Sequence, residues 1–96
     1  MGGGAEPLGP SAAQKVIRRI AKALACSFSR HAAEQLQKRN LTTVDCLNTL
    51  AAGVVRPAEW ENGTWRYRVE SHRIAVVVAI ESDAELRVVT AWRIAK

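Results

Sequence analysis

The apolar residues of this chain change their spacing once, at Gly53, and this change limits the folds that are open to it. Before Gly53 they recur every three or four positions, as in Val16, Ile20 and Leu24, which is the period of an amphipathic helix. After Gly53 they alternate with polar residues, as in 64–70, or form short β-branched runs, which is typical of strands. The sequence therefore predicts an α+β domain in which the helices come first and the sheet comes last.

Capping and turn residues set the bounds of the expected elements. A serine at 27 or 29 can cap a second helix, Thr42 and Asp45 have the spacing of a capping box, and Asn62 with Gly63 is a strong hairpin signal. We expect helices at 11–25, at 30–39 and from the Thr42 cap to Gly53, and strands at 54–56, 64–70, 73–81 and 86–94. The N-terminal helices should pack on one side of a C-terminal four-stranded antiparallel sheet.

The length of 96 residues allows one hydrophobic core. We expect a flexible, glycine-rich leader at 1–10 and a single domain at 11–96. The longest apolar run, 74–80, is far shorter than the roughly 20 residues of a membrane helix, and the leader lacks the basic and apolar stretches of a secretion signal. These features predict a cytoplasmic protein with no membrane partner, in which Cys26 and Cys46 are buried thiols.

The charge of the chain favours an anionic partner. Lysine and arginine number 14 against 9 acidic residues, which gives a formal net charge of +5, and ten of the 14 are arginines. The guanidinium group offers a planar fork of donors that suits phosphate groups, so this bias points to a partner such as RNA. The basic face of the expected helix at 11–25 has two interpretations: a solvated surface on a packed helix, or a contact for RNA or a partner.

Arginines also recur at alternate positions in the strand region. Arg66 and Arg68 share one face of their expected strand, and Arg87 and Arg93 share one face of the last strand. Side chains at this spacing can line a groove for phosphates. The alternative is that they form the solvated back of a half-buried sheet.

Two other side chains are candidates for chemistry. His31, near the start of the second helix, belongs to the residue type that titrates closest to neutral pH. Thr90 interrupts the apolar alternation of Leu86, Val88 and Trp92, so its hydroxyl needs a partner if it is buried. The two histidines and two cysteines are scattered without the close spacing of metal ligands, and we expect neither a metal nor a cofactor.

Four short segments occur in an order that resembles a known family: SRHA at 29–32, KRNLT at 38–42, RYRV at 66–69 and VVTAWR at 88–93. Together they resemble the RelE/ParE-like toxin superfamily, and within it the BrnT-like small bacterial toxins. The resemblance implies a RelE-like fold of the barnase/colicin/RelE type and a toxin-type endoribonuclease of a bacterial toxin–antitoxin system. The implied reaction is metal-independent cleavage of RNA by attack of the ribose 2′-hydroxyl. The implied partners are RNA and a cognate antitoxin protein, with the ribosome as a further possible partner.

The resemblance also implies roles for individual residues. His31 matches the family histidine and is the expected acid or base, Arg68 is the expected stabiliser of the phosphorane, and Thr90 is a positioning hydroxyl. Four further arginines are expected to bind RNA: Arg39, Arg66, Arg73 and Arg93. One position departs from the family pattern, because Gln35 stands where the family has an arginine.

His31 belongs to the helical half of the chain, whereas Arg68 and Thr90 belong to the sheet half. A shared site would therefore lie at the seam between the two halves. Two alternatives to the ribonuclease remain open. One is a non-catalytic RNA- or protein-binding module on the same fold, and the other is a ParE-type toxin directed at a topoisomerase.

Overall fold

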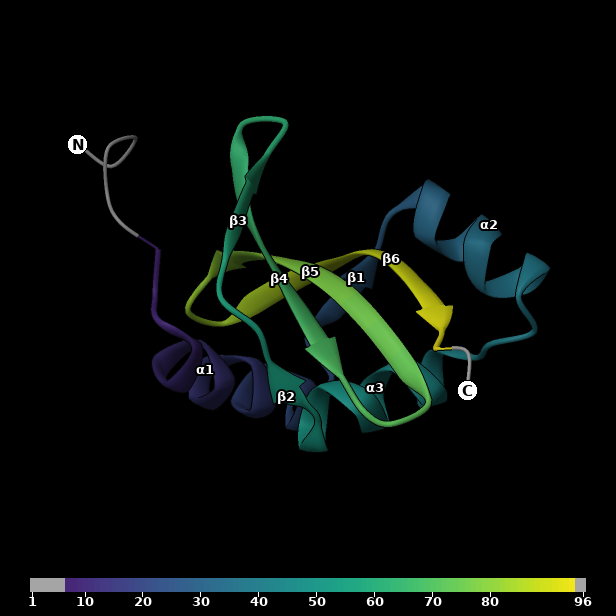
Figure 1. Cartoon of the computed structure of the whole chain (residues 1–96), viewed down its shortest axis with the longest axis horizontal. Helices are drawn as coiled ribbons and strands as arrows, with labels where there is room; N and C mark the ends of the chain where they lie inside the picture. The colour runs from purple at the N-terminus through teal and green to yellow at the C-terminus, as the bar shows by residue number, and fades with distance from the viewer. Residues whose placement is uncertain (1–6, 95–96) are drawn as a thin grey trace.

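The computed structural model describes residues 7–94, which form three helices and six strands (Figure 1). In chain order these are α1 (Pro10–Lys22), β1 (Cys26–Phe28), α2 (Arg30–Lys38), α3 (Thr43–Ala52), β2 (Val54–Val55), β3 (Glu59–Glu61), β4 (Thr64–Glu70), β5 (Ile74–Ser82) and β6 (Glu85–Arg93). The α+β class predicted from the sequence is confirmed. The predicted capping box is also present, because the side chains of Thr42 and Asp45 each accept from the other residue's amide.

The strands form one mixed sheet in the order β1-β6-β5-β4-β2, and β3 also pairs with β4. β1 runs parallel to β6, whereas all the other pairs are antiparallel. The four predicted strands are present and pair antiparallel to one another, but the prediction of a four-stranded, purely antiparallel sheet is wrong, because β1 and β3 are additional and β1 adds a parallel pair. β1 and β3 have three residues each, too few to display an alternating pattern, and β3 is exposed throughout.

Helices α1 and α3 cover one face of the sheet, and α2 lies against β6 (Figure 1). Ile17 and Ile20 of α1 and Leu50 of α3 meet Val76 and Val78 of β5 in the core, and all five are at most 1% exposed. Burial of a side chain of this size stabilises the fold by roughly 1.5–3 kcal/mol. We call the opposite face of the sheet, turned away from α1 and α3, the outer face. None of the helices in residues 7–94 has the length and apolar character needed to cross a bilayer.

Part of the segment expected as a leader belongs to the fold. Helix α1 begins at Pro10, and the hydroxyl of the buried Tyr67 donates to the carbonyl oxygen of Leu8 over 2.9 Å. Residues 1–6 of the expected leader lie outside the described residues.

Gly53 joins the helical half to the sheet half at a point with no room for a side chain. Its backbone is extended, with φ −76° and ψ 173°, so the glycine is not needed for a left-handed conformation. A Cβ at this position would lie 2.7 Å from the carbonyl oxygen of Thr49, 2.9 Å from that of Glu70 and 2.9 Å from Cγ1 of Val69. Two of these three neighbours are backbone atoms, which cannot move without shifting α3 or β4.

We therefore expect Gly53→Ala to lower the free energy of unfolding by about 1–3 kcal/mol, the usual cost of overpacking a tight site. Urea denaturation followed by circular dichroism measures this change. Gly9→Ala is the comparison: a Cβ there meets no atom within 4 Å, so the variant loses only the glycine at the N-cap of α1 and should be destabilised less than Gly53→Ala. Equal stability of the two variants would contradict the role assigned to Gly53.

Candidate active site

A β-bulge in β6 decides which side chains reach the outer face. Thr90 pairs with Val77, but the next pair along the strands joins Val88 to Val78, so Val89 is an extra residue in β6. Because side chains alternate between the two faces of a strand, one extra residue exchanges the faces for everything beyond it. The bulge therefore reverses the alternation between the two halves of β6.

This reversal decides which side chains of β6 are buried and which lie on the outer face. Leu86 and Val88, before the bulge, are buried in the core, and so is Ala91, beyond it. Thr90 and Trp92 consequently face outward, where both are half-buried. The sequence alternation grouped them with Leu86 and Val88, and this expectation is wrong because the period of two does not continue through the bulge.

The outer face carries three rows of side chains across β4, β5 and β6: Arg66–Ala79–Arg87, Arg68–Val77–Thr90 and Glu70–Ala75–Trp92. Arg68 and Thr90 thus lie in one row, two strands apart, with Val77 between them. Their backbones are about 10 Å from each other at the ordinary strand spacing. Arg93 lies on the opposite face from Arg87, so the expectation that these two arginines share a face is wrong.

Ser29 places His31 beside the bulge. The Ser29 amide donates to the carbonyl oxygen of Val88 over 3.1 Å, and its hydroxyl donates to that of Val89 over 3.4 Å. The same hydroxyl accepts from the amide of Ala32 over 3.0 Å and so caps helix α2. His31 follows two residues after the cap, and its side chain is exposed at the edge of the outer face.

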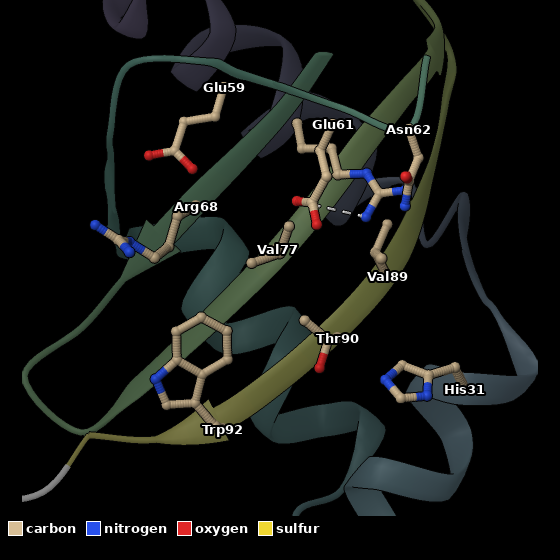
Figure 2. A pocket seen from close by; sticks show the side chains of 10 residues that line it. His31, Glu59, Glu61, Asn62, Arg68, Val77, Val89, Thr90 and Trp92 are labelled. Atoms are coloured by element: carbon tan, nitrogen blue, oxygen red, sulfur yellow. Dashed lines mark ion pairs between the residues drawn. The ribbon is translucent and has the colours of Figure 1, made fainter. Parts of the chain in front are cut away.

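A pocket of about 470 Å³ lies on the outer face between β4, β5, β6, the β3–β4 hairpin and the start of α2 (Figure 2). The three predicted catalytic residues His31, Arg68 and Thr90 all line it, together with Arg66. Figure 2 shows His31 and Arg68 on opposite sides of the view, with Thr90 between them. The structure therefore brings residues of the helical half and of the sheet half into one pocket.

The pocket has a mixed charge. Arg66, whose side chain is 16% exposed, has its Nη1 atom 3.8 Å from Oε1 of Glu61. Arg68, whose side chain is 44% exposed, has its Nε atom 2.8 Å from Oε2 of Glu70. Glu59 and Glu61 both line the pocket beside the two arginines. Each cation of the pocket thus has a carboxylate partner.

The two glutamates were not among the residues selected from the sequence. The hairpin signal at 62–63 contained the information needed to find them. Pairing back across this turn sets Glu61 opposite Thr64 and Glu59 opposite Arg66, as observed. Residues opposite each other on paired strands share a face, so the arginine face of β4 identifies the glutamates of β3.

Three arginines expected to bind RNA are not among the residues that line the pocket. Nη1 of Arg39 donates to the carbonyl oxygen of Ala91 over 2.7 Å, and Nη2 of Arg93 donates to that of Asn40 over 2.7 Å. These bonds join the end of α2 to the end of β6. Arg73 lies in the turn between β4 and β5.

The two thiols are free and lie outside the pocket. Cys46 is buried as predicted, whereas Cys26 is half-buried. Burial raises the pKa of Cys46 to about 11 and also raises the pKa of Cys26, which disfavours the reactive thiolate. Within residues 7–94, no cluster of three or more histidine, cysteine or acidic side chains is arranged to hold a metal ion.

The chain matches a known family model. A family model described as "Domain of unknown function (DUF4258)" matches residues 28–93, which is more than half of the chain. Every residue that lines the pocket falls within this range, whereas α1 lies before it. No curated protein and no solved structure matches the chain.

The double role of Ser29 predicts that Ser29→Ala lowers the free energy of unfolding by about 0.5–2 kcal/mol, the usual effect of removing a helix N-cap. Because the bond to Val89 is lost as well, the backbone amide signals of His31 and Thr90 should shift in NMR spectra. Ser27→Ala, at an exposed position of β1, is the control and should change neither property. Unchanged signals of His31 and Thr90 in Ser29→Ala would show that the serine does not position the site.

Proposed function

We propose that this chain, which belongs to the DUF4258 family, is a metal-independent endoribonuclease of the toxin type on a RelE-like scaffold. The observation that carries the proposal is the pocket in which His31, Arg68 and Thr90 meet from α2, β4 and β6, with Arg66 beside them. A titratable ring, guanidinium groups and a hydroxyl are suited to cleavage of RNA by its own 2′-hydroxyl. The net charge of +5 favours approach of a polyanion.

In the proposed reaction, the ribose 2′-hydroxyl loses its proton to a base, and the 2′-oxygen attacks the adjacent phosphorus. The bond from phosphorus to the 5′-oxygen of the next nucleotide then breaks, and an acid donates a proton to this leaving oxygen. The products are a 2′,3′-cyclic phosphate and a free 5′-hydroxyl. The chain therefore has to supply two proton-transfer groups and cations for the charged phosphorane.

The pocket offers an imidazole and two carboxylates for the proton transfers. His31 stands at the start of α2, and Glu59 and Glu61 stand on β3. In our proposal a carboxylate of β3 accepts the proton of the 2′-hydroxyl, and His31 donates a proton to the leaving oxygen. This division assigns the two proton transfers to groups on different elements of the pocket, β3 and α2.

Arg68 is the more exposed of the two arginines in the pocket, so we assign it the contact with the phosphate. Its side chain is 44% exposed and its carboxylate partner is Glu70. Exposed ion pairs of this kind contribute about 0–1 kcal/mol, so a phosphate can replace Glu70 at little cost. The planar guanidinium can then donate to two phosphate oxygens at once, while the Thr90 hydroxyl in the same row orients the reacting group.

A second candidate function is an RNA-binding module without catalysis. Gln35 favours it, because this residue stands where the toxins that the chain resembles have an arginine. Such a module would bind RNA with a steep dependence on salt and leave it intact. The proposal that the chain acts in a toxin–antitoxin system, with an antitoxin and the ribosome as partners, rests on the sequence resemblance.

The ribonuclease proposal predicts that the purified chain cleaves a labelled single-stranded RNA in the presence of EDTA and leaves a cyclic phosphate end. His31→Ala should reduce the cleavage rate by about 10²–10⁴-fold, the usual contribution of a general acid or base. Arg68→Ala should reduce it by about 10²–10³-fold, the usual effect of removing one group that stabilises developing charge. Denaturing gels and mass spectrometry of the products measure both.

His72→Ala provides the histidine control, because His72 is exposed in the turn between β4 and β5 and does not line this pocket. Its cleavage rate should equal that of the wild type. RNA that stays intact in the presence of the wild-type protein would contradict the ribonuclease proposal. Salt-sensitive RNA binding would then favour the binding module, whereas a loss of DNA supercoiling in cells would favour the topoisomerase-directed toxin.

The assignment of the base predicts that at least one of Glu59→Gln and Glu61→Gln reduces cleavage by about 10²–10⁴-fold. RNA affinity should be unchanged or higher in both variants, because glutamine keeps the shape and removes a negative charge. Glu85→Gln, at the exposed start of β6, is the control for the loss of one negative charge outside the pocket, and it should cleave at the wild-type rate. Wild-type rates in both pocket variants, alongside a slow His31→Ala, would show that the proton acceptor is not on β3.

A further inference from the structure

We propose that Trp92 is a stacking platform for one unpaired base of a single-stranded RNA, whose neighbouring phosphate binds Arg68. This inference rests on the proposed function, because it takes RNA as the ligand of the pocket. It adds the form of RNA that the pocket accepts and the residue that selects it.

The first observation is that Trp92 faces the pocket only because of the bulge at Val89. Without the extra residue, the alternation of β6 would place Trp92 on the same face as Val88, in the core. A tryptophan contributes most to folding when its roughly 150–250 Å² of surface is buried. This one is instead half-buried on the outer face, where it lines the pocket.

The second observation concerns the neighbours of the indole. Across β5 its partner is Ala75, whose methyl group is too small to cover the ring, and Ala75 itself is fully buried. Thr90 lies two residues along the strand, about 7 Å away. Arg68 stands in the same row as Thr90, and Arg68, Thr90 and Trp92 all line the pocket (Figure 2). A base on Trp92 would therefore have its phosphate within reach of Arg68.

The chemistry of these groups selects an unpaired base. Stacking on an aromatic side chain requires a nucleobase with a free face, and in duplex RNA both faces are covered by neighbouring base pairs. An aromatic ring beside arginines is the usual combination in sites for single strands, where the cations follow the backbone. A purely apolar ligand would offer Arg68 and Arg66 no group to bind.

Binding of an RNA strand that cannot be cleaved tests the inference. A fluorescein-labelled single strand with 2′-O-methyl groups throughout lacks the attacking hydroxyl, and its anisotropy reports affinity. We expect Trp92→Leu to weaken binding about 5- to 150-fold, which corresponds to the roughly 1–3 kcal/mol of one base–aromatic stack. Trp92→Phe keeps a ring and should recover most of the affinity. The same sequence as a duplex should bind the wild type more weakly than the single strand.

Abasic RNA separates stacking from a structural effect. In a series of strands with one base removed at each position in turn, one position should weaken binding to the wild type by the same 5- to 150-fold. The same removal should cost little with Trp92→Leu, because the base has already lost its platform. A merely misfolded variant would lose affinity for intact and abasic strands alike.

Trp92→Leu with wild-type affinity, or an abasic penalty equal in both proteins, would overturn the inference. If such a protein still cleaves ordinary RNA, the proposed function stands without the platform. Binding that depends on Trp92 without cleavage of ordinary RNA supports the platform and overturns the nuclease. A wild-type protein that does not bind the single strand overturns both.

Discussion

The arrangement of the outer-face site depends on the way Ser29 holds the bulge of β6. Its amide and hydroxyl donate to two successive carbonyl groups, those of Val88 and Val89. The same hydroxyl caps α2 and so fixes the direction in which the chain leaves β1 and begins the helix that carries His31. One serine therefore couples the helix that carries His31 to the position at which Thr90 turns outward. Bulges are frequent next to active sites because they re-aim side chains, and here the re-aimed residues are Thr90 and Trp92.

The sequence predicted the elements that are long enough to show a period. The strands at 64–70, 73–81 and 86–94 and the helix at 30–39 lie within one residue of β4, β5, β6 and α2. The strands β1 and β3 were not predicted, because three residues cannot display an alternation. Gly53 was placed correctly at the change of period, but its physical reason is the close approach of α3 and β4.

The candidate site was predictable to the extent that it does not depend on register. His31 and Arg68 could be selected from their residue types and from the family resemblance. The outward direction of Thr90 and Trp92 could not be predicted, because counting by two along β6 carries an error through Val89 to the end of the strand. The glutamates of β3 were missed because a strand of three residues shows no alternation, although pairing back from the hairpin signal at 62–63 places them opposite β4.

The partners of the arginines indicate which of them could bind an anion, and the net charge does not. Arg18 donates to carbonyl oxygens at the end of α3, Arg19 to that of Asp83, and Arg39 and Arg93 to carbonyls of β6 and of the end of α2. Helix ends leave carbonyl groups without intrahelical partners, and a guanidinium that satisfies them would leave a polar group unpaired if it moved to a ligand. Arg68 of β4 has a carboxylate partner near the surface instead, and such a pair contributes little. Arg68 can therefore exchange its carboxylate for a phosphate on the outer face, in the pocket that His31, Thr90 and Trp92 also line.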